Sequence, residues 1–241
     1  MKEGVSMKTK GILFIISKEQ LKPNLQHVAN EVAEQLSVPF KIYFFKEENR
    51  LEEDILELIA KGCHEIIFLP VSLFSSTEIR ETLPKRISAI LAQRTTVTPT
   101  FLKPLGSTHA ILHFLAAQLA QQANLLPQAV LLIAQANLND AAIYDELKDL
   151  AQKLTIISGR KVYFASVSGD FSYHSVIAQL KFPLLVQPLL IDTTLARKIT
   201  SEIGTLRGQQ DTILPSLGES QVLKKALWER LKEVGGIKSS P

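Results

Sequence analysis

The stretch CHEIIFLPVSLFSSTEIRETLP, residues 63–84, decides the fold that we predict for this chain. It opens with the apolar run Ile66–Leu69, whose β-branched and aromatic side chains are typical of a strand buried on both faces. Pro70 interrupts this run, and the polar turn Ser75-Ser76-Thr77 then leads into a helical pattern that starts at Glu78. Ligands of open α/β sheets bind just past the carboxyl ends of strands, so Ser75, Ser76 and Glu78 are the first candidate site residues.

Short apolar runs alternate with amphipathic helical patterns on both sides of this stretch. In the first half of the chain the pattern predicts strands over 11–16, 41–45, 65–73 and 98–105, the last of them an edge strand. It predicts helices over 22–36, 51–59, 78–92 and 108–122. Pro84 predicts an irregular first turn in the third helix, and Ser107 is the predicted N-cap of the fourth.

The same pattern then starts again. AVLLIA at 129–134 resembles GILFII at 11–16, KVYFA at 161–165 nearly repeats KIYFF at 41–45, and FPLLVQPLLI at 182–191 repeats the third strand. Pro188 follows Pro70 by 118 positions, and Val130 follows Ile12 by the same 118. A repeat of this length indicates a duplicated domain, because solenoid repeats run to only about 20–50 residues.

The fold class that follows is α/β, with two tandem duplicated βαβαβαβα domains. Each domain is expected to hold a four-stranded parallel sheet with right-handed crossovers and helices on both faces. The predicted domains are 1–125 and 126–241, joined by a linker over 121–128, and the pair is expected to enclose a ligand cleft. In the second half we predict a helix over 139–155 (capped by Asn139 or Asp140), a helix from after the turn at 192–194 to about 206, an edge strand over 212–217 and a helix over 219–234.

Composition excludes several classes of protein. Hydrophobic residues make up 46% and charged residues 21%, as in ordinary globular proteins, and the net charge of +3 comes without the basic block of a nucleic-acid-binding protein. The apolar run at 12–16 is too short for a signal peptide core or a membrane span, so the predicted location is the cytoplasm. Glycine-rich phosphate loops and nucleophile-elbow serines are absent, and Cys63 is expected to be a packed hydrophobe.

Two tandem halves in this order, the strand–proline–turn–helix unit and the Pro-Leu-Gly step at 104–106 together resemble the sirohydrochlorin chelatases. These class II chelatases insert iron or cobalt into a tetrapyrrole for sirohaem or cobalamin synthesis. The resemblance covers about 11–234 and implies a tetrapyrrole partner and divalent iron or cobalt as substrate, without a permanently bound cofactor. The charge pattern and the short apolar runs predict no nucleic acid or membrane partner, and a homodimer is one of the assemblies that stay open.

The family carries histidines at two strand ends, and this chain has other residues there. The first histidine falls on Ser17, within Ile16-Ser17-Lys18-Glu19, and the second on Glu78, ahead of Thr82-Leu83-Pro84. A family acidic residue falls near Lys46 or Glu47. Carboxylates bind divalent metals through oxygen and are ionised at pH 7, so Glu78 and Glu47 become the metal-ligand candidates, with Glu78 and Ser17 at the catalytic positions. The alternative for these glutamates is a solvated acidic rim.

Cationic side chains near the strand ends complete the candidate site. Lys18, Lys46 and Arg80 are expected to pair with the carboxylates of the macrocycle, beside Ser75 and Ser76. Three functions stay open: a chelatase with carboxylate ligation, a non-catalytic paralogue that binds tetrapyrrole or metal or that partners an active chelatase, and a small-molecule sensor of the periplasmic-binding type.

One histidine pair also has a spacing that metals use. His109 and His113 stand four apart on a predicted helix and share one face. The alternatives for them are a metal site and helix packing or capping. Two ligands leave a divalent ion mostly hydrated, so we predict no tight metal binding there.

Overall fold

The computed structural model describes residues 9–16, 22–45, 50–92, 94, 96–122 and 129–235, with only the backbone for 22–24, 209 and 219. The chain forms two compact units. One contains Met1–Pro104 and Arg230–Pro241, and the other contains Leu105–Glu229.

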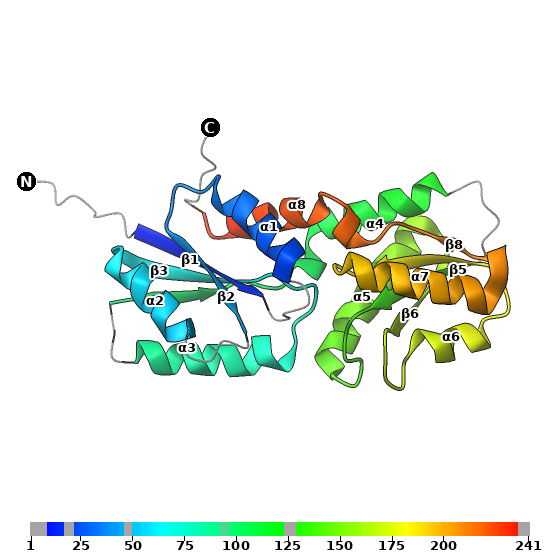
Figure 1. The fold of residues 1–241 in the computed structure, drawn as a ribbon, viewed down its shortest axis with the longest axis horizontal. Helices are drawn as coiled ribbons and strands as arrows, with labels where there is room; N and C mark the ends of the chain where they lie inside the picture. The colour runs from blue at the N-terminus through cyan, green and yellow to red at the C-terminus, as the bar shows by residue number, and fades with distance from the viewer. Residues whose placement is uncertain are drawn as a thin grey trace, which may run out of the picture. The chain divides into compact units, whose positions relative to one another are not determined.

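The first unit contains a four-stranded parallel sheet in the order β2-β1-β3-β4. Its strands are β1 (Thr9–Ile16), β2 (Phe40–Phe44), β3 (Cys63–Pro70) and β4 (Thr98–Phe101). The helices between them are α1 (Lys22–Ala33), α2 (Arg50–Ala60), the π-helix η2 (Glu78–Thr82) and α3 (Leu83–Leu91). Helices α2 and α3 pack on one face of the sheet, while α1 contacts β1 and β2 (Figure 1).

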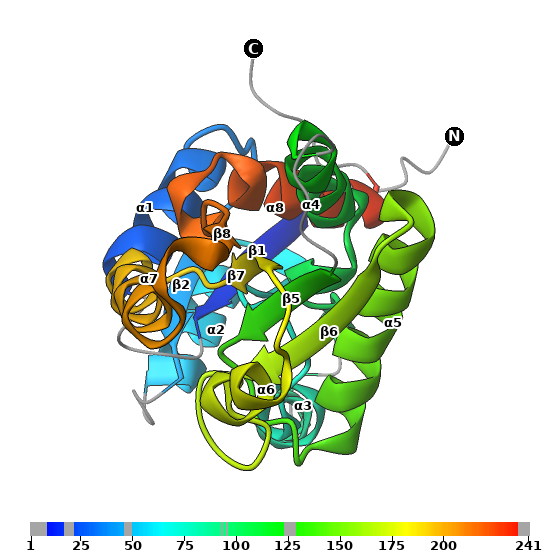
Figure 2. The ribbon, with the colours of Figure 1, turned by 90° about the vertical axis from the view of Figure 1, so that its right-hand side faces the viewer.

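The second unit repeats this sheet in the equivalent order β6-β5-β7-β8, again all parallel. Its strands are β5 (Ala129–Ala134), β6 (Lys161–Ser166), β7 (Leu184–Leu189) and β8 (Thr212–Ile213). Its helices are α4 (His109–Gln121), α5 (Ala141–Ser158), α6 (Tyr173–Gln179) and α7 (Thr193–Arg207), with 3₁₀ turns η3 (Leu105–Ser107), η4 (Gly208–Gln210) and η5 (Leu217–Glu219). Helices α6 and α7 cover one face, and α5 runs beside β6 (Figure 2).

The register of the two sheets shows that the halves are duplicates. Ile15 on β1 pairs with Pro70 on β3, and Ile133 on β5 pairs with Pro188 on β7. Each member of the second pair stands 118 positions after its counterpart in the first. The two predicted parallel sheets with one shared strand order are therefore confirmed.

The last helix, α8 (Val222–Glu233), spans the division between the units, because the first unit includes the chain from Arg230 onward. The Arg230 guanidinium is buried and donates to the carbonyl oxygen of Pro104 from Nε at 3.1 Å and from Nη2 at 2.7 Å. The compact units thus differ in membership from the two halves of the sequence, and most of the expected linker, 123–128, lies outside the described residues. The domain boundary near 125 stays a prediction.

The two edge strands are shorter than the apolar pattern predicts, and proline explains why. Strand β4 ends at Phe101 rather than 105, and the Leu102 N–H still donates to Phe68 O at 3.0 Å. The next bond of a parallel ladder would run from the N–H of residue 70 to the carbonyl of residue 102, and proline has no N–H. Pro70 therefore ends the pairing of β3 with β4, and β3 itself ends at Pro70 rather than at 73.

Proline has the same effect in the second sheet. The Leu214 N–H donates to Val186 O at 2.9 Å, and Pro188 lacks the donor for the next bond. Strand β8 consequently covers only Thr212–Ile213 instead of the predicted 212–217. In both halves the N–H that proline lacks ends the ladder, so the segment after the edge strand does not pair with the sheet.

Two helix starts refine the sequence-based expectations. The irregular turn expected near Pro84 is η2, in which the N–H of Leu83 donates to Glu78 O. A regular α-turn would need an N–H at residue 84 and would press the proline ring against the carbonyl of Arg80, so the wider π-turn relieves both problems. The predicted Ser107 cap of α4 is wrong: Thr108 adopts the extended conformation and accepts from Ile111 N, because Ser107 belongs to η3. Asp140 caps α5 as expected.

Candidate functional site

The carboxyl edge of the first sheet brings three strand ends together. Ile16 pairs with Phe44, and the N–H of Val71 donates to Ile15 O at 2.8 Å, so β1, β2 and β3 end side by side. The segments that follow these strands begin at this common edge. Four candidate residues, Ser17, Lys18, Lys46 and Glu47, belong to such segments but lie outside the described residues. Their roles stay predictions.

The segment after β3 is described in full and forms a compact loop. Val71 and Leu73 are buried and anchor it to the core. Within the loop the Ser72 hydroxyl donates to Phe74 O at 3.2 Å, and the Ser76 N–H donates to the same carbonyl at 3.2 Å. Ser75 and Ser76 are partly exposed, and their roles as ligand-binding residues stay predictions.

Arg80 holds this loop against the helix that follows it. Its guanidinium Nη1 donates to the Ser75 carbonyl, and its backbone N–H donates to Ser76 O at 2.9 Å. The side chain therefore fixes the turn that carries both serines. Its predicted contact with a macrocycle carboxylate would use other N–H groups of the guanidinium, which has five.

Glu78 opens η2 at the tip of the same loop. Its side chain is exposed, and its backbone carbonyl accepts from the Leu83 N–H in the π-turn. An exposed carboxylate beside the ends of parallel strands is accessible to a metal ion or to a proton donor. Ser17, the other catalytic candidate, is outside the described residues.

His109 contacts an acidic side chain at the start of α4. Its Nδ1 lies 3.0 Å from Glu229 Oε1, and the same carboxylate accepts from the backbone N–H groups of His109 and Ala110 at 2.7 and 2.9 Å. The imidazole thus contacts the carboxylate that pairs with the first N–H groups of α4, while His113 is exposed one turn later. Across the residues that the structure describes, no group of three or more His, Cys, Asp or Glu side chains is placed to hold a metal ion.

Cys63 is buried, and this burial raises the pKa of its thiol. It packs in the core cluster of α2 and α3, as a small hydrophobe does.

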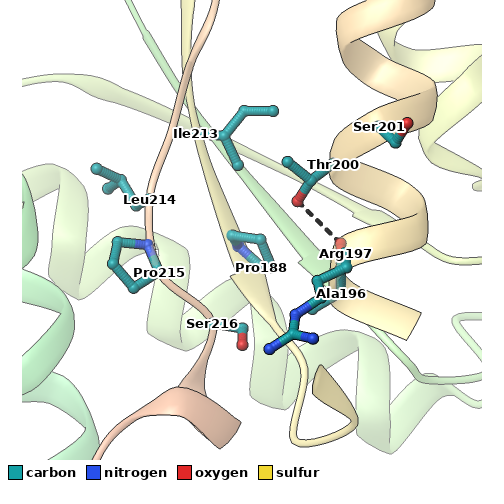
Figure 3. A pocket seen from close by; sticks show the side chains of 9 residues that line it. All are labelled: Pro188, Ala196, Arg197, Thr200, Ser201, Ile213, Leu214, Pro215 and Ser216. Atoms are coloured by element: carbon teal, nitrogen blue, oxygen red, sulfur yellow. Dashed lines mark hydrogen bonds between the residues drawn. The ribbon is translucent and has the colours of Figure 1, made fainter. Parts of the chain in front are cut away.

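Sequence reasoning missed a pocket at the carboxyl edge of the second sheet. Its volume is about 390 Å³, and it lies between the end of β7, the first half of α7 and the segment after β8 (Figure 3). The residues that line it are Pro188, Ala196, Arg197, Thr200, Ser201, Ile213, Leu214, Pro215 and Ser216. The repeated proline at 188 marked this strand end, but no pattern in the sequence joins 196–201 with 213–216.

Comparisons with known proteins identify the fold. A sequence model of the CbiX family matches residues 17–122. SirB from Bacillus subtilis with Fe³⁺ aligns with a TM-score of 0.79 and 18% identity, over 95% of this chain and 96% of that one. SirB from the subspecies spizizenii, in complex with cobalt, aligns with a TM-score of 0.76 and 17% identity, over 93% and 94%. A search of curated proteins finds no match.

A third similar structure is CbiX, described as the terminal enzyme for biosynthesis of siroheme in denitrifying bacteria. It aligns with a TM-score of 0.63 and 17% identity, over 94% of this chain and 99% of that one. The resemblance inferred from the sequence is therefore confirmed: the chain has the two-unit chelatase fold, and its N-terminal half matches the CbiX family. Among the described residues, no helix has both the length and the apolar character that a membrane crossing needs.

Proposed function

We propose that this protein, whose fold is that of the chelatases SirB and CbiX, inserts Fe²⁺ or Co²⁺ into sirohydrochlorin for sirohaem or cobalamin synthesis. The observation that carries the proposal is the match of residues 17–122 to the CbiX family, because this range includes all three segments at the carboxyl edge of the first sheet. The similar SirB structures contain Fe³⁺ or cobalt. The metal is a substrate in this proposal, the setting is the cytoplasm, and a homodimer is one assembly compatible with it.

Metal insertion imposes two demands on the protein. A divalent cation must be held near the macrocycle, and two protons must leave the central nitrogens as the metal replaces them. A carboxylate serves both demands, because its oxygens ligate divalent cations and accept protons. We assign this role to Glu78, with Glu47 as a second metal ligand and with Ser17 at the other catalytic position.

The remaining candidates bind the macrocycle rather than the metal. Lys18, Lys46 and Arg80 are proposed to pair with its peripheral carboxylates, and Ser75 and Ser76 to donate hydrogen bonds. The contact of Arg80 with Ser75 O supports a further role, since it holds both serines in one conformation.

A second candidate function is tetrapyrrole binding without metal insertion. It is favoured by the resemblance found in the sequence, which places Ser17 and Glu78 at the two histidine positions of the family. Imidazole suits iron and cobalt as a ligand and exchanges protons near neutral pH, and a serine does neither well.

The test is the loss of the free-base sirohydrochlorin spectrum with Co²⁺ or Fe²⁺, measured beside the uncatalysed reaction. For the chelatase, Glu78→Gln is expected to lower the insertion rate about 10²-fold, because general base catalysis typically contributes that much or more. Glu81→Gln is the matched control, since Glu81 is exposed in the same π-helix and ion-pairs with Lys85 at 3.9 Å.

Each function has its own outcome. A wild-type rate equal to the uncatalysed rate, with retained sirohydrochlorin binding, refutes the chelatase and supports the binding protein. A wild-type rate above background that Glu78→Gln leaves unchanged refutes the role of Glu78.

A further inference from the structure

The pocket of the second unit is built around an arginine. Arg197 lies on the first half of α7, and its guanidinium extends toward the side of the pocket where Ser216 lies (Figure 3). Within the described part of the chain, no hydrogen bond or ion pair of this guanidinium is found. The other cations of α7 differ: Lys198 lies 3.9 Å from Glu202, and Arg207 binds Asp211. Arg197 is exposed, so its guanidinium is available to a ligand in the pocket.

The remaining walls are mostly apolar and rigid. Five of the lining residues, Pro188, Ala196, Ile213, Leu214 and Pro215, present hydrocarbon surface. The ring of each proline fixes its backbone torsion, so the walls need little ordering when a ligand binds. Thr200 donates its hydroxyl to Ala196 O at 2.8 Å, which directs that polar group into the helix.

A buried glutamine holds the wall that follows β8. Gln187 is fully buried in β7, where the first sheet has Leu69 at the equivalent position, 118 residues earlier. Its Nε2 donates to Pro215 O at 2.9 Å and to Pro188 O at 3.4 Å, so it ties together two residues that line the pocket. Among the described residues its Oε1 has no hydrogen-bond partner. An unpaired buried amide oxygen is destabilising, and therefore the glutamine indicates a positioning role for the pocket wall.

We propose that this pocket binds a carboxylate group on a short alkyl chain, with Arg197 as the counter-ion and the proline-lined walls around the hydrocarbon. One guanidinium matches the charge and the planar geometry of one carboxylate. A phosphate or sulfate dianion would leave most of its oxygens against apolar walls, which costs free energy. The volume of about 390 Å³ lies in the range of small-molecule sites.

Such a carboxylate has two sources: a free organic acid, or an acetate or propionate arm of a macrocycle. The second source rests on the proposed function, and the first does not. Acetate, propionate and butyrate are the probes for the first source, titrated into the isotope-labelled full chain by NMR at constant ionic strength. Affinity is expected to rise up to about fourfold for each added CH₂, as burial of a methylene predicts.

The variant Arg197→Gln is expected to weaken propionate binding at least tenfold, because a charge-assisted contact is lost. Lys198→Gln is the matched control: it removes the neighbouring cation, which does not line the pocket, and is expected to change the affinity less than twofold. Metal-free sirohydrochlorin binding, followed by its absorbance, is measured with the same two variants.

The two binding assays distinguish a free acid from a macrocycle arm as the source of the carboxylate. Weaker propionate binding in Arg197→Gln alone supports a free acid, and weaker sirohydrochlorin binding in that variant supports the macrocycle arm. The proposal is overturned if Arg197→Gln and Lys198→Gln bind both probes equally, or if resonances of the pocket residues do not respond to either probe. Because no metal is present, failure of metal insertion does not affect this result.

Discussion

The carboxylate of Glu229 stabilises a helix that begins 120 residues earlier in the chain. It accepts the N–H groups of His109 and Ala110 at 2.7 and 2.9 Å, which are among the unpaired donors at the start of α4. Only 28% of its side chain is exposed, so water replaces these contacts incompletely when the carboxylate is removed. The negative charge of the carboxylate also interacts favourably with the positive end of the helix dipole.

The magnitude follows from these contacts. Glu229→Gln keeps one carbonyl oxygen but loses the charge, which we expect to lower the free energy of unfolding by about 1–2 kcal/mol. Glu229→Ala removes both acceptors, and a loss of about 2–3 kcal/mol is expected. Asp149→Asn serves as the control, because its ion pair with Lys153 joins side chains that are 59% and 50% exposed and is expected to contribute less than about 1 kcal/mol.

The stabilisation by Glu229 is expected to decrease as the pH falls. Partial burial raises the pKa of Glu229. The N–H groups of His109 and Ala110 and the His109 side chain lower it by more, so the pKa lies below its ordinary value of 4.5. Stability from a carboxylate with a lowered folded pKa is complete above the ordinary value and is lost as the pH falls through the folded one. The difference between wild type and Glu229→Gln is therefore expected at pH 7 and shrinks below about pH 4.5.

Urea denaturation followed by the fluorescence of Trp228 measures the effect, because this single tryptophan is the neighbour of Glu229. Curves at pH 7 and at about pH 3.5 are compared for wild type, both Glu229 variants and Asp149→Asn. Equal stability of wild type and Glu229→Gln at pH 7, or a difference that stays constant down to pH 3.5, would refute the reasoning.

Two further predictions concern the second unit. Arg207→Met is expected to destabilise the protein by about 3–5 kcal/mol, because the Asp211 side chain is only 2% exposed and would keep its charge without its partner. Thermal or urea unfolding measures this loss of stability, and a loss below about 1 kcal/mol would contradict the prediction. Gly218→Ala is expected to lower the free energy of unfolding by about 3 kcal/mol, since its Cβ would lie 2.0 Å from the Ile191 carbonyl oxygen. Gly204→Ala in α7 is the control: its Cβ meets nothing within 4 Å, and the substitution is expected to stabilise the protein. Equal stability of the two alanine variants would show that the backbone yields.

The duplication and the two parallel sheets could be predicted from the sequence because they rest on local patterns. Apolar runs that recur 118 residues apart mark buried parallel strands, and both copies carry proline at the same register. The ends of the edge strands could not be predicted, because they depend on which side of β3 or β7 the missing N–H faces. The prediction of the α4 cap failed for a related reason. Ser107 and Thr108 are both good N-cap residues, and only the backbone conformation distinguishes them.

The candidate site was predictable only where it follows a strand in the sequence. Ser75, Ser76 and Glu78 were found because the polar turn comes directly after an apolar run. The contact of Arg80 with Ser75 O depends on the π-turn, and the role of Glu229 depends on a pairing across 120 residues. The pocket around Arg197 was missed for the same reason, since its walls come from two separate segments.

The prolines at 70 and 188 also determine which kinds of partner these sheets can accept. A guest peptide adds to a sheet through alternating backbone donors and acceptors, and at these two positions the donor does not exist. Past the ends of β4 and β8, the ladder along β3 and β7 therefore lacks the donor that a further residue of a paired strand would need. Small molecules need no such ladder. The duplication preserved this missing donor in two copies, at the carboxyl edge of each sheet where a compact ligand could bind.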